Sequence, residues 1–267
     1  MIKPIIPLNK KSVAIRFDRA AKLYDLNATV QREITLRLSN LIKKNIDSEQ
    51  LWCDIGSATG ALLEHLTPLP PLTRFICLDL AFSPLRRAAQ RTGCGLALNG
   101  DIDFPPIWPM SLNGAVAASM LQWVSSPKHA LCKISELLKP DGVLYFAVFV
   151  EGSFKELTAV RANRGLPPAV WLPSESELFS IFENAGFDIL KESIEPFNRT
   201  LQFPDAMSAL KSLSKIGATA TTEKFLNRKE LDELCRDYTS MFSQSGTVSL
   251  TYSSVIGMAR KRADKKL

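Results

Sequence analysis

The chain has 267 residues, of which 46% are hydrophobic and 22% charged, with 33 Lys and Arg against 27 Asp and Glu. This composition fits one large folded domain or two small ones, and it excludes collagen-like, low-complexity and disordered chains. No apolar run reaches the roughly 18–20 residues of a membrane-spanning helix, and the N-terminus lacks the apolar stretch of a signal peptide.

The first segment, residues 12–44, is predicted to be helical. Its apolar residues recur at spacings of three and four, and Asn27 is expected to divide it into two helices. Positive charge concentrates here, because residues 1–50 hold ten Lys or Arg against five Asp or Glu. Residues 260–267 hold five against one. Two basic ends favour association with an acidic partner, although solvated termini are the simpler explanation.

From residue 45 the pattern changes to short apolar strands that alternate with helices. The expected strands are residues 51–55, 74–79, 96–99, 114–119 and 143–150. The expected helices between them are residues 60–66, 84–91 and 127–138. This alternation predicts an α/β fold with a parallel sheet and helices on both of its faces.

After residue 151 the order of elements is looser. Helices are expected at 154–163, 174–185, 205–216 and 227–242, extended segments at 187–194 and 200–203, and a closing antiparallel strand at 247–258. We therefore expect one sheet domain, residues 45–203 and 247–259, with covering helices at 1–44, a helical lid at 204–246 and a basic tail at 260–267. Both helical segments are expected to cover the active edge of the sheet.

The strongest local signal is Asp-Ile-Gly-Ser-Ala-Thr-Gly at 54–60, which lies between a strand and a helix. Gly56 and Gly60 allow a tight turn and a close approach to a ligand. Ala58 stands where a pyrophosphate-binding loop has its middle glycine, and Asp54 would repel phosphate but attract an ammonium group. An ordinary turn without a ligand is the alternative.

Two further acids follow the next two strands. Asp79, with Leu80 after it, ends the second strand, where a carboxylate can accept hydrogen bonds from both ribose hydroxyls. Asp101 and Ile102 follow the third strand, where they can bind the amino group and pack on the ring of adenine. Asp79 can also simply begin a helix, and Asp101 can belong to an ordinary turn. Acids at three successive strand ends predict a site for adenosine joined to an amino acid, as in S-adenosylmethionine.

Residues after the fourth strand and on the N-terminal helices complete the predicted site. Ser119 is expected to face the cofactor, and Trp123 to form a wall of the substrate pocket. Tyr24 and Gln31 are expected to contact the methionine end of the cofactor or the substrate. For Trp123, Tyr24 and Gln31 the alternative is ordinary packing in the core.

These features resemble the class I methyltransferases that use S-adenosylmethionine, and more narrowly the malonyl-[acyl-carrier protein] O-methyltransferases of biotin synthesis. The resemblance runs from about residue 13 to residue 260. It is carried by Phe-Asp-Arg-Ala-Ala at 17–21, Gln-Trp at 122–123, Gly-Ser-Phe-Lys-Glu-Leu at 152–157, Asp-Ala-Met-Ser-Ala-Leu-Lys-Ser-Leu at 205–213 and Ile-Gly-Ala-Thr at 216–219. The chain departs from the family at Ser57 and Ala58, where the family usually has Cys-Gly.

The resemblance implies a Rossmann-like fold whose seven-stranded, mostly parallel sheet carries N-terminal helices and a helical lid. It also implies methyl transfer from S-adenosylmethionine to the free carboxylate of a malonyl thioester. A carboxylate is already an anion at neutral pH, so no general base is expected. A cation is expected to hold that carboxylate, with Arg199, Lys211 and Arg16 as candidates, each of which can instead be a solvated surface charge.

The implied partner is the malonyl form of an acyl-carrier protein. Such carriers are acidic, so docking is expected on a basic surface made of Arg16, Arg19 and Lys22 with Lys211 and Lys215 of the lid. A methyltransferase acting on another small acid or a quinone remains an alternative. So does a relative that assembles respiratory complex I by modifying an arginine.

Other partners and sites are not expected. A nucleic-acid partner is only weakly supported, because basic residues do not interleave with aromatics in the body of the chain. The absence of an Asn/Asp-Pro-Pro-aromatic motif after the fourth strand argues against methylation of a base amino group. The five Cys show neither a zinc pattern nor a disulfide framework, which indicates free thiols in a reducing compartment. We therefore expect a cytoplasmic protein without a metal or membrane site.

Overall fold

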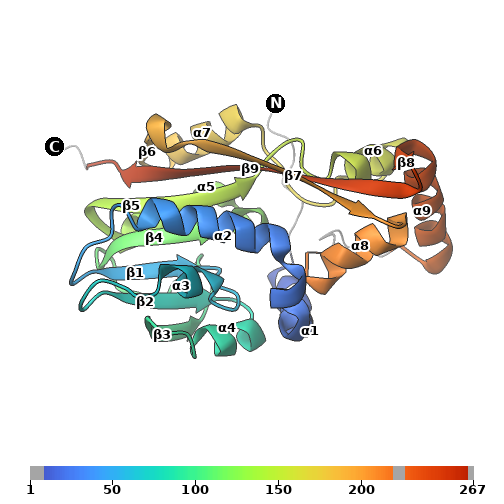
Figure 1. Ribbon diagram of the computed structural model, residues 1–267. Helices are drawn as coiled ribbons and strands as arrows, with labels where there is room; N and C mark the ends of the chain where they lie inside the picture. The colour runs from blue at the N-terminus through green and yellow to red at the C-terminus, as the bar shows by residue number, and fades with distance from the viewer. Residues whose placement is uncertain (1–8, 219–225, 264–267) are drawn as a thin grey trace.

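The computed structural model describes residues 9–218 and 226–263 (Figure 1). Its strands are β1 (Leu51–Ile55), β2 (Arg74–Asp79), β3 (Cys94–Asn99), β4 (Leu112–Ala118), β5 (Leu138–Phe149), β6 (Phe187–Ile189), β7 (Glu195–Phe203), β8 (Ser243–Gln244) and β9 (Thr247–Lys261). Its α-helices are α1 (Lys10–Asn27), α2 (Thr29–Ile42), α3 (Ala61–Leu66), α4 (Phe82–Ala88), α5 (Pro127–Leu137), α6 (Lys155–Asn163), α7 (Glu175–Asn184), α8 (Ala206–Lys215) and α9 (Arg228–Phe242).

One sheet runs through the described residues in the order β3-β2-β1-β4-β5-β9-β6, and β7 and β8 also pair with β9. The first five strands are parallel, whereas β9 is antiparallel to β5, β6 and β7. The predicted mostly parallel sheet with a closing antiparallel strand is therefore confirmed. Its carboxyl ends meet at one edge, which is where parallel α/β sheets bind ligands.

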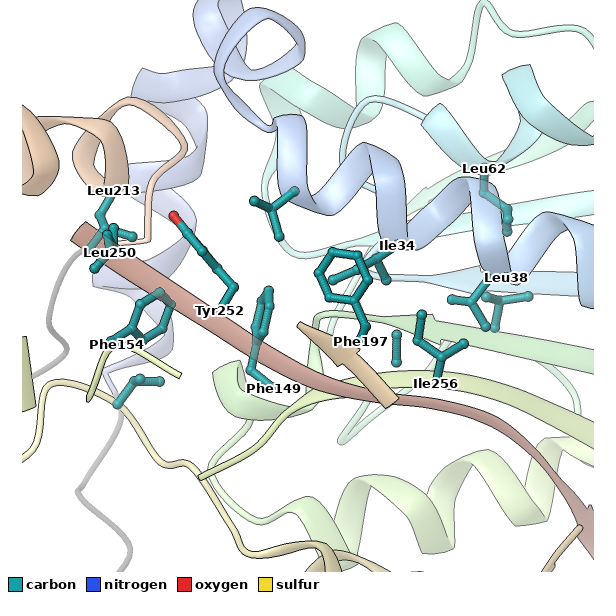
Figure 2. Close-up of a cluster of buried hydrophobic side chains, with 14 of the residues drawn as sticks. Ile34, Leu38, Leu62, Phe149, Phe154, Phe197, Leu213, Leu250, Tyr252 and Ile256 are labelled. Carbon is teal, nitrogen blue, oxygen red and sulfur yellow. The ribbon is translucent and has the colours of Figure 1, made fainter. Parts of the chain in front are cut away.

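Helices cover both faces of the sheet because both faces are apolar. On one face Ile34 and Leu38 of α2 belong to the same core as Leu62 of α3 (Figure 2). Ile42 of α2 and Leu85 of α4 also belong to this core. On the other face Leu131 and Ile134 of α5 join the core formed with α7. The buried residues of α2 recur along one side of the helix, and this side packs on a face of the sheet.

The long strand β9 extends beyond its partner β5. Residues 254–260 of β9 pair with β5, whereas residues 248–253 continue alongside β7. We call the two-stranded extension of β7 and β9, with α6, α8 and α9 packed on it, the arm (Figure 1). Tyr238 of α9 donates a hydrogen bond to the Ser249 carbonyl at 2.7 Å, and buried Glu156 of α6 accepts from the Thr251 hydroxyl at 2.6 Å. These bonds attach both helices to β9.

Several predicted boundaries differ from the structure. β9 continues to Lys261, so Arg260 and Lys261 of the predicted basic tail pair with Val143 and Phe187 in the sheet. Residues 139–142, which separate the expected helix 127–138 from the expected strand 143–150, lie within β5 as an irregularity, because the pairing with β4 moves from Leu138 directly to Val143. Residues 219–225 of the predicted lid, Thr219 of its motif, and residues 264–267 lie outside the described residues. No described helix is both long and apolar enough to cross a membrane.

Candidate active site

Two joined cavities lie at the carboxyl edge of the parallel strands. The smaller one, the edge cavity, has a volume of about 100 Å³ and lies between α1 and the ends of β1, β2 and β4. The larger one, the arm cavity, has a volume of about 200 Å³ and extends between α1, α6, α8 and α9. Phe17, Tyr24, Ser119 and Trp123 line both cavities. A ligand in the edge cavity can therefore meet a ligand in the arm cavity at these four residues.

The glycine-rich loop after β1 forms the floor of the edge cavity. Gly56 has φ +71°, and a Cβ added to it would lie 2.7 Å from the Cβ of Met120. Gly60 has φ +77°, and a Cβ there would lie 3.0 Å from the backbone of Ala88 in α4. The lack of a side chain at Gly60 therefore allows α4 to pack closely against the loop. Ala58 adopts φ +44°, a left-handed conformation that favours glycine. The loop therefore keeps its tight turn, although Ala58 stands where the family usually has glycine.

Asp79 lines the edge cavity and also organises the loop. One carboxylate oxygen accepts a hydrogen bond from the Ala58 N–H and the other from the Ala81 N–H, both at 2.7 Å. Burial raises its pKa to about 6, although these two N–H groups act in the opposite direction. Leu80 lines the same cavity. Because Ala81 is the N-cap of α4, Asp79 does contact the start of a helix; its predicted contact with a ribose stays a prediction.

Asp54 is nearly inaccessible, with 3% of its surface exposed, and it does not line either cavity. Burial and the nearby charge of Asp79 raise its pKa to about 7. Two acids that share a buried region in this way favour a positively charged ligand.

The N-terminus of α1 reaches the end of β3. Asp101 and Ile102 both line the edge cavity, and their predicted contact with adenine stays a prediction. The Lys10 ammonium group lies 2.6 Å from the Asp101 carboxylate and also pairs with Asp103. Sequence analysis did not identify Lys10, because its partners lie more than ninety residues away along the chain.

Unpaired polar atoms surround the junction of the cavities. The Ser119 hydroxyl is buried without a hydrogen-bond partner among the described residues, and Ser119 has φ +55°. The side-chain oxygen of Gln122, which lines the arm cavity, is likewise buried and unpaired, while the amide nitrogen of this side chain donates to the Ser119 carbonyl at 2.7 Å. Buried polar atoms normally have partners, so these two atoms indicate a polar ligand.

Aromatic side chains narrow the junction. The rings of Phe17 and Trp123 meet edge to face with centroids 5.6 Å apart, and Tyr24 lies 6.3 Å from Phe17. Burial and the charges of Asp79, Asp25 and Asp54 raise the pKa of Tyr24, so its phenol stays protonated and can donate a hydrogen bond. Gln31 lines the arm cavity and not the edge cavity.

The predicted cations lie elsewhere. Arg199 on β7 has 57% of its side chain exposed and lies 4.0 Å from Glu33, and Lys211 on α8 is exposed. Neither Arg199, Lys211 nor Arg16 lines a cavity among the described residues, and their predicted contact with the substrate stays a prediction. Arg161 of α6, which sequence analysis did not identify, lines the arm cavity.

Comparison with known proteins identifies the family. A model described as a methyltransferase domain matches residues 26–192. A malonyl-[acyl-carrier protein] O-methyltransferase from Erwinia pyrifoliae is 31% identical over 85% of both chains. The chain belongs to this methyltransferase family. A protein of the same name from Geobacter sulfurreducens is 27% identical over 95% of this chain and 100% of its own.

Solved structures show the same fold. The YcgJ protein from Bacillus subtilis has a TM-score of 0.61 at 16% identity, covering 85% of this chain and 99% of that one. The [4+2]-cyclase SpnF has a TM-score of 0.60 at 16% identity, covering 98% of both chains. A cyclase among these neighbours shows that the fold alone does not set the reaction.

Family membership makes this methyltransferase an S-adenosylmethionine-dependent enzyme. The residues of the edge cavity fit that cofactor. The carboxylates of Asp79 and Asp101, which line this cavity, and the unpaired Ser119 hydroxyl suit a cationic ligand with many hydroxyl and amino groups.

Proposed function

We propose that this methyltransferase esterifies the free carboxylate of malonyl-acyl-carrier protein. The names of its relatives support this substrate, and one observation on the arm cavity supports the reaction. Among the described residues that line this cavity there is no Asp, Glu, His or Lys, and the polar ones are Tyr24, Gln31, Ser119, Gln122 and Arg161. A site without a general base fits an acceptor that is already an anion.

In the proposed arrangement the cofactor occupies the edge cavity. Asp79 accepts hydrogen bonds from the ribose, Asp101 and Ile102 bind the adenine, and Leu80 packs beside them. The loop at Gly56 to Gly60 and the buried charge of Asp54 serve the amino-acid end.

The chain's own residues then align the reactants. The cofactor supplies a methyl group on a positively charged sulfur. Phe17 and Trp123 narrow the junction and exclude water, while the protonated Tyr24 phenol and the Ser119 hydroxyl orient polar groups there. Because the carboxylate needs no activation, positioning of the oxygen about 3 Å from the methyl carbon supplies most of the acceleration.

The proposed function is tested with labelled S-adenosylmethionine and four candidate acceptors: malonyl-carrier protein, acetyl-carrier protein, malonyl-coenzyme A and free malonic acid. Malonyl-carrier protein is expected to accept the methyl group, acetyl-carrier protein to accept none, and malonyl-coenzyme A to react with a higher KM. Equal transfer to free malonic acid and to malonyl-carrier protein would contradict a carrier-bound substrate and favour a small-acid methyltransferase.

The proposed carrier-binding surface is the exposed side of α1 together with α8, which packs beside it (Figure 1). Ile15, Arg19, Lys22 and Leu26 follow one another at spacings of four, three and four, and all are exposed. Such spacing places basic and apolar side chains on one helix face. On α8, Lys211 and Lys215 are also exposed. This combination suits an acidic, amphipathic partner.

Reversing two charges on this surface tests the docking proposal. For the double variant Arg19→Glu and Lys22→Glu we expect the KM for malonyl-carrier protein to rise about tenfold, because complementary charges assist the encounter. The KM for malonyl-coenzyme A is expected to stay unchanged. As a matched control, Lys128→Glu with Lys191→Glu reverses two exposed charges away from α1. A carrier KM that responds equally to both double variants would contradict the proposed surface.

The affinity for the cofactor is expected to rise with pH. In the folded protein without ligand, burial raises the pKa of Asp54 to about 7 and that of Asp79 to about 6. The two protonated acids therefore contribute fully to the free energy of unfolding below about pH 4. This contribution is lost as the pH rises through the two raised pKa values. A cationic ligand favours their ionised forms, so affinity should increase about tenfold between about pH 5.5 and pH 8.

Calorimetric titration of S-adenosylmethionine across this pH range measures the effect. The Asp54→Asn variant is expected to bind more weakly and to lose the upper part of the pH dependence. An affinity of the unchanged protein that is constant over this range would show that neither acid changes protonation on binding.

A further inference from the structure

Arg161 is a buried cation in an otherwise apolar cavity. It lies on α6 with 6% of its surface exposed. It shares the wall of the arm cavity with Leu157 one turn before it, Val170 of the following loop and Leu234 of α9. Among the described residues that line this cavity it carries the one positive charge.

The charge of Arg161 has no acidic partner. Its Nε donates a hydrogen bond to the Pro167 carbonyl at 2.8 Å, and no described carboxylate lies within 4.0 Å of its guanidinium group. Arg164, one turn later, differs in this respect: it pairs with Glu233 and with Asp237, the latter at 2.6 Å. Burial lowers the pKa of Arg161, but an arginine side chain remains charged at neutral pH.

A buried charge without a partner is costly, and an anion that enters the cavity would remove that cost. The Nε bond to Pro167 fixes the orientation of the guanidinium plane, and its remaining N–H groups have no partner among the described residues. A planar guanidinium with free N–H groups is well matched to a carboxylate.

We propose that Arg161 binds the carboxylate of the acyl substrate and is the residue that selects an acid over an uncharged acyl group. This inference rests on the proposed function. A carboxylate has two oxygens, so one can pair with Arg161 while the other receives the methyl group. An acetyl group would leave the guanidinium unpaired, and the neutral ester would lose most of the attraction, which favours release of the product.

The test measures binding of malonyl-carrier and acetyl-carrier protein with S-adenosylhomocysteine present, so that no transfer occurs. The unchanged enzyme is expected to bind the malonyl form at least about tenfold more tightly, as a charge-assisted hydrogen bond allows. In Arg161→Gln the malonyl affinity should fall about 10–100-fold and the acetyl affinity should stay the same. Arg161→Lys should retain part of the preference, because it keeps the charge without the planar fork.

Lys155→Gln serves as the matched control, because it removes an exposed charge from the same helix. It should leave the malonyl preference intact. If Arg161→Gln weakens both carriers equally, Arg161 only supports the wall of the cavity and the proposal is overturned. If the unchanged enzyme transfers methyl groups to malonyl-carrier protein but shows no preference for it over acetyl-carrier protein, Arg161 is not the selecting residue. If it shows neither preference nor transfer, the proposed function itself fails.

Discussion

Gly56→Ala is expected to reduce the affinity for S-adenosylmethionine by at least about 100-fold and to destabilise the fold. The added Cβ would lie 2.7 Å from the Cβ of Met120, which is the rigid base of a buried side chain. Gly56 also has φ +71°, where any other residue is strained. Relief of the overlap requires the loop to move away from the end of β4, which would alter the floor of the edge cavity.

The matched control for Gly56 is Gly246→Ala. Gly246 has φ +78°, but nothing lies within 4 Å of an added Cβ there. This variant therefore carries the same backbone strain without the overlap, and it should lose about 1 kcal/mol of stability with no change in cofactor affinity. Isothermal titration and thermal unfolding of both variants separate the two effects. Equal cofactor affinities for the two variants would contradict the placement of the cofactor against Gly56.

Asp79→Ala is expected to have an effect of similar size on cofactor affinity. Its carboxylate orders the loop through the Ala58 N–H and the start of α4 through the Ala81 N–H. Its loss removes the proposed ribose contacts and leaves both N–H groups without their partner. We expect a loss of affinity of about 100-fold or more, measured by calorimetric titration.

Two variants refine the interpretation of Asp79. Asp79→Asn keeps one acceptor oxygen, so it should bind the cofactor better than Asp79→Ala. Asp188→Ala removes an exposed acid that pairs with Arg262 at 2.7 Å, and such surface pairs contribute little. If Asp79→Ala and Asp188→Ala bind the cofactor with equal affinity, Asp79 does not belong to the cofactor site.

Much of the edge cavity could be predicted, because the position of each residue relative to its own strand is visible in the local sequence. Asp79 and Asp101 each follow an apolar strand, and parallel strands bring their carboxyl ends to one edge. The left-handed turns at Gly56 and Gly60 follow from the glycines themselves. A reader of the sequence can therefore place these residues without knowing how the distant parts of the chain pack.

The arm cavity depends on packing that sequence patterns do not encode. Arg161 occupies an ordinary position in a short helix, and its burial comes from the loop at Val170 and from α9. From the sequence alone Arg199 is as suitable a cation as Arg161, but in the structure its side chain on β7 is exposed. Similarly, the pattern of α2 predicts a helix but not which part of the sheet it covers.

The central claim is that the methyl group is transferred to a carboxylate oxygen. Malonyl thioesters also have an acidic carbon, which is a second candidate acceptor for the methyl group. Transfer to carbon needs a base, and no Asp, Glu, His or Lys lines the arm cavity within the described ranges 9–218 and 226–263.

The most direct test is therefore to identify the methylated atom. The purified enzyme is incubated with malonyl-carrier protein and S-adenosylmethionine carrying a labelled methyl group, and the acyl group is released and analysed by mass spectrometry before and after mild hydrolysis. The structure predicts a methyl ester, whose label is lost as methanol on hydrolysis. A label that survives hydrolysis as methylmalonate would contradict the account, because it would require a base that the described arm cavity does not supply.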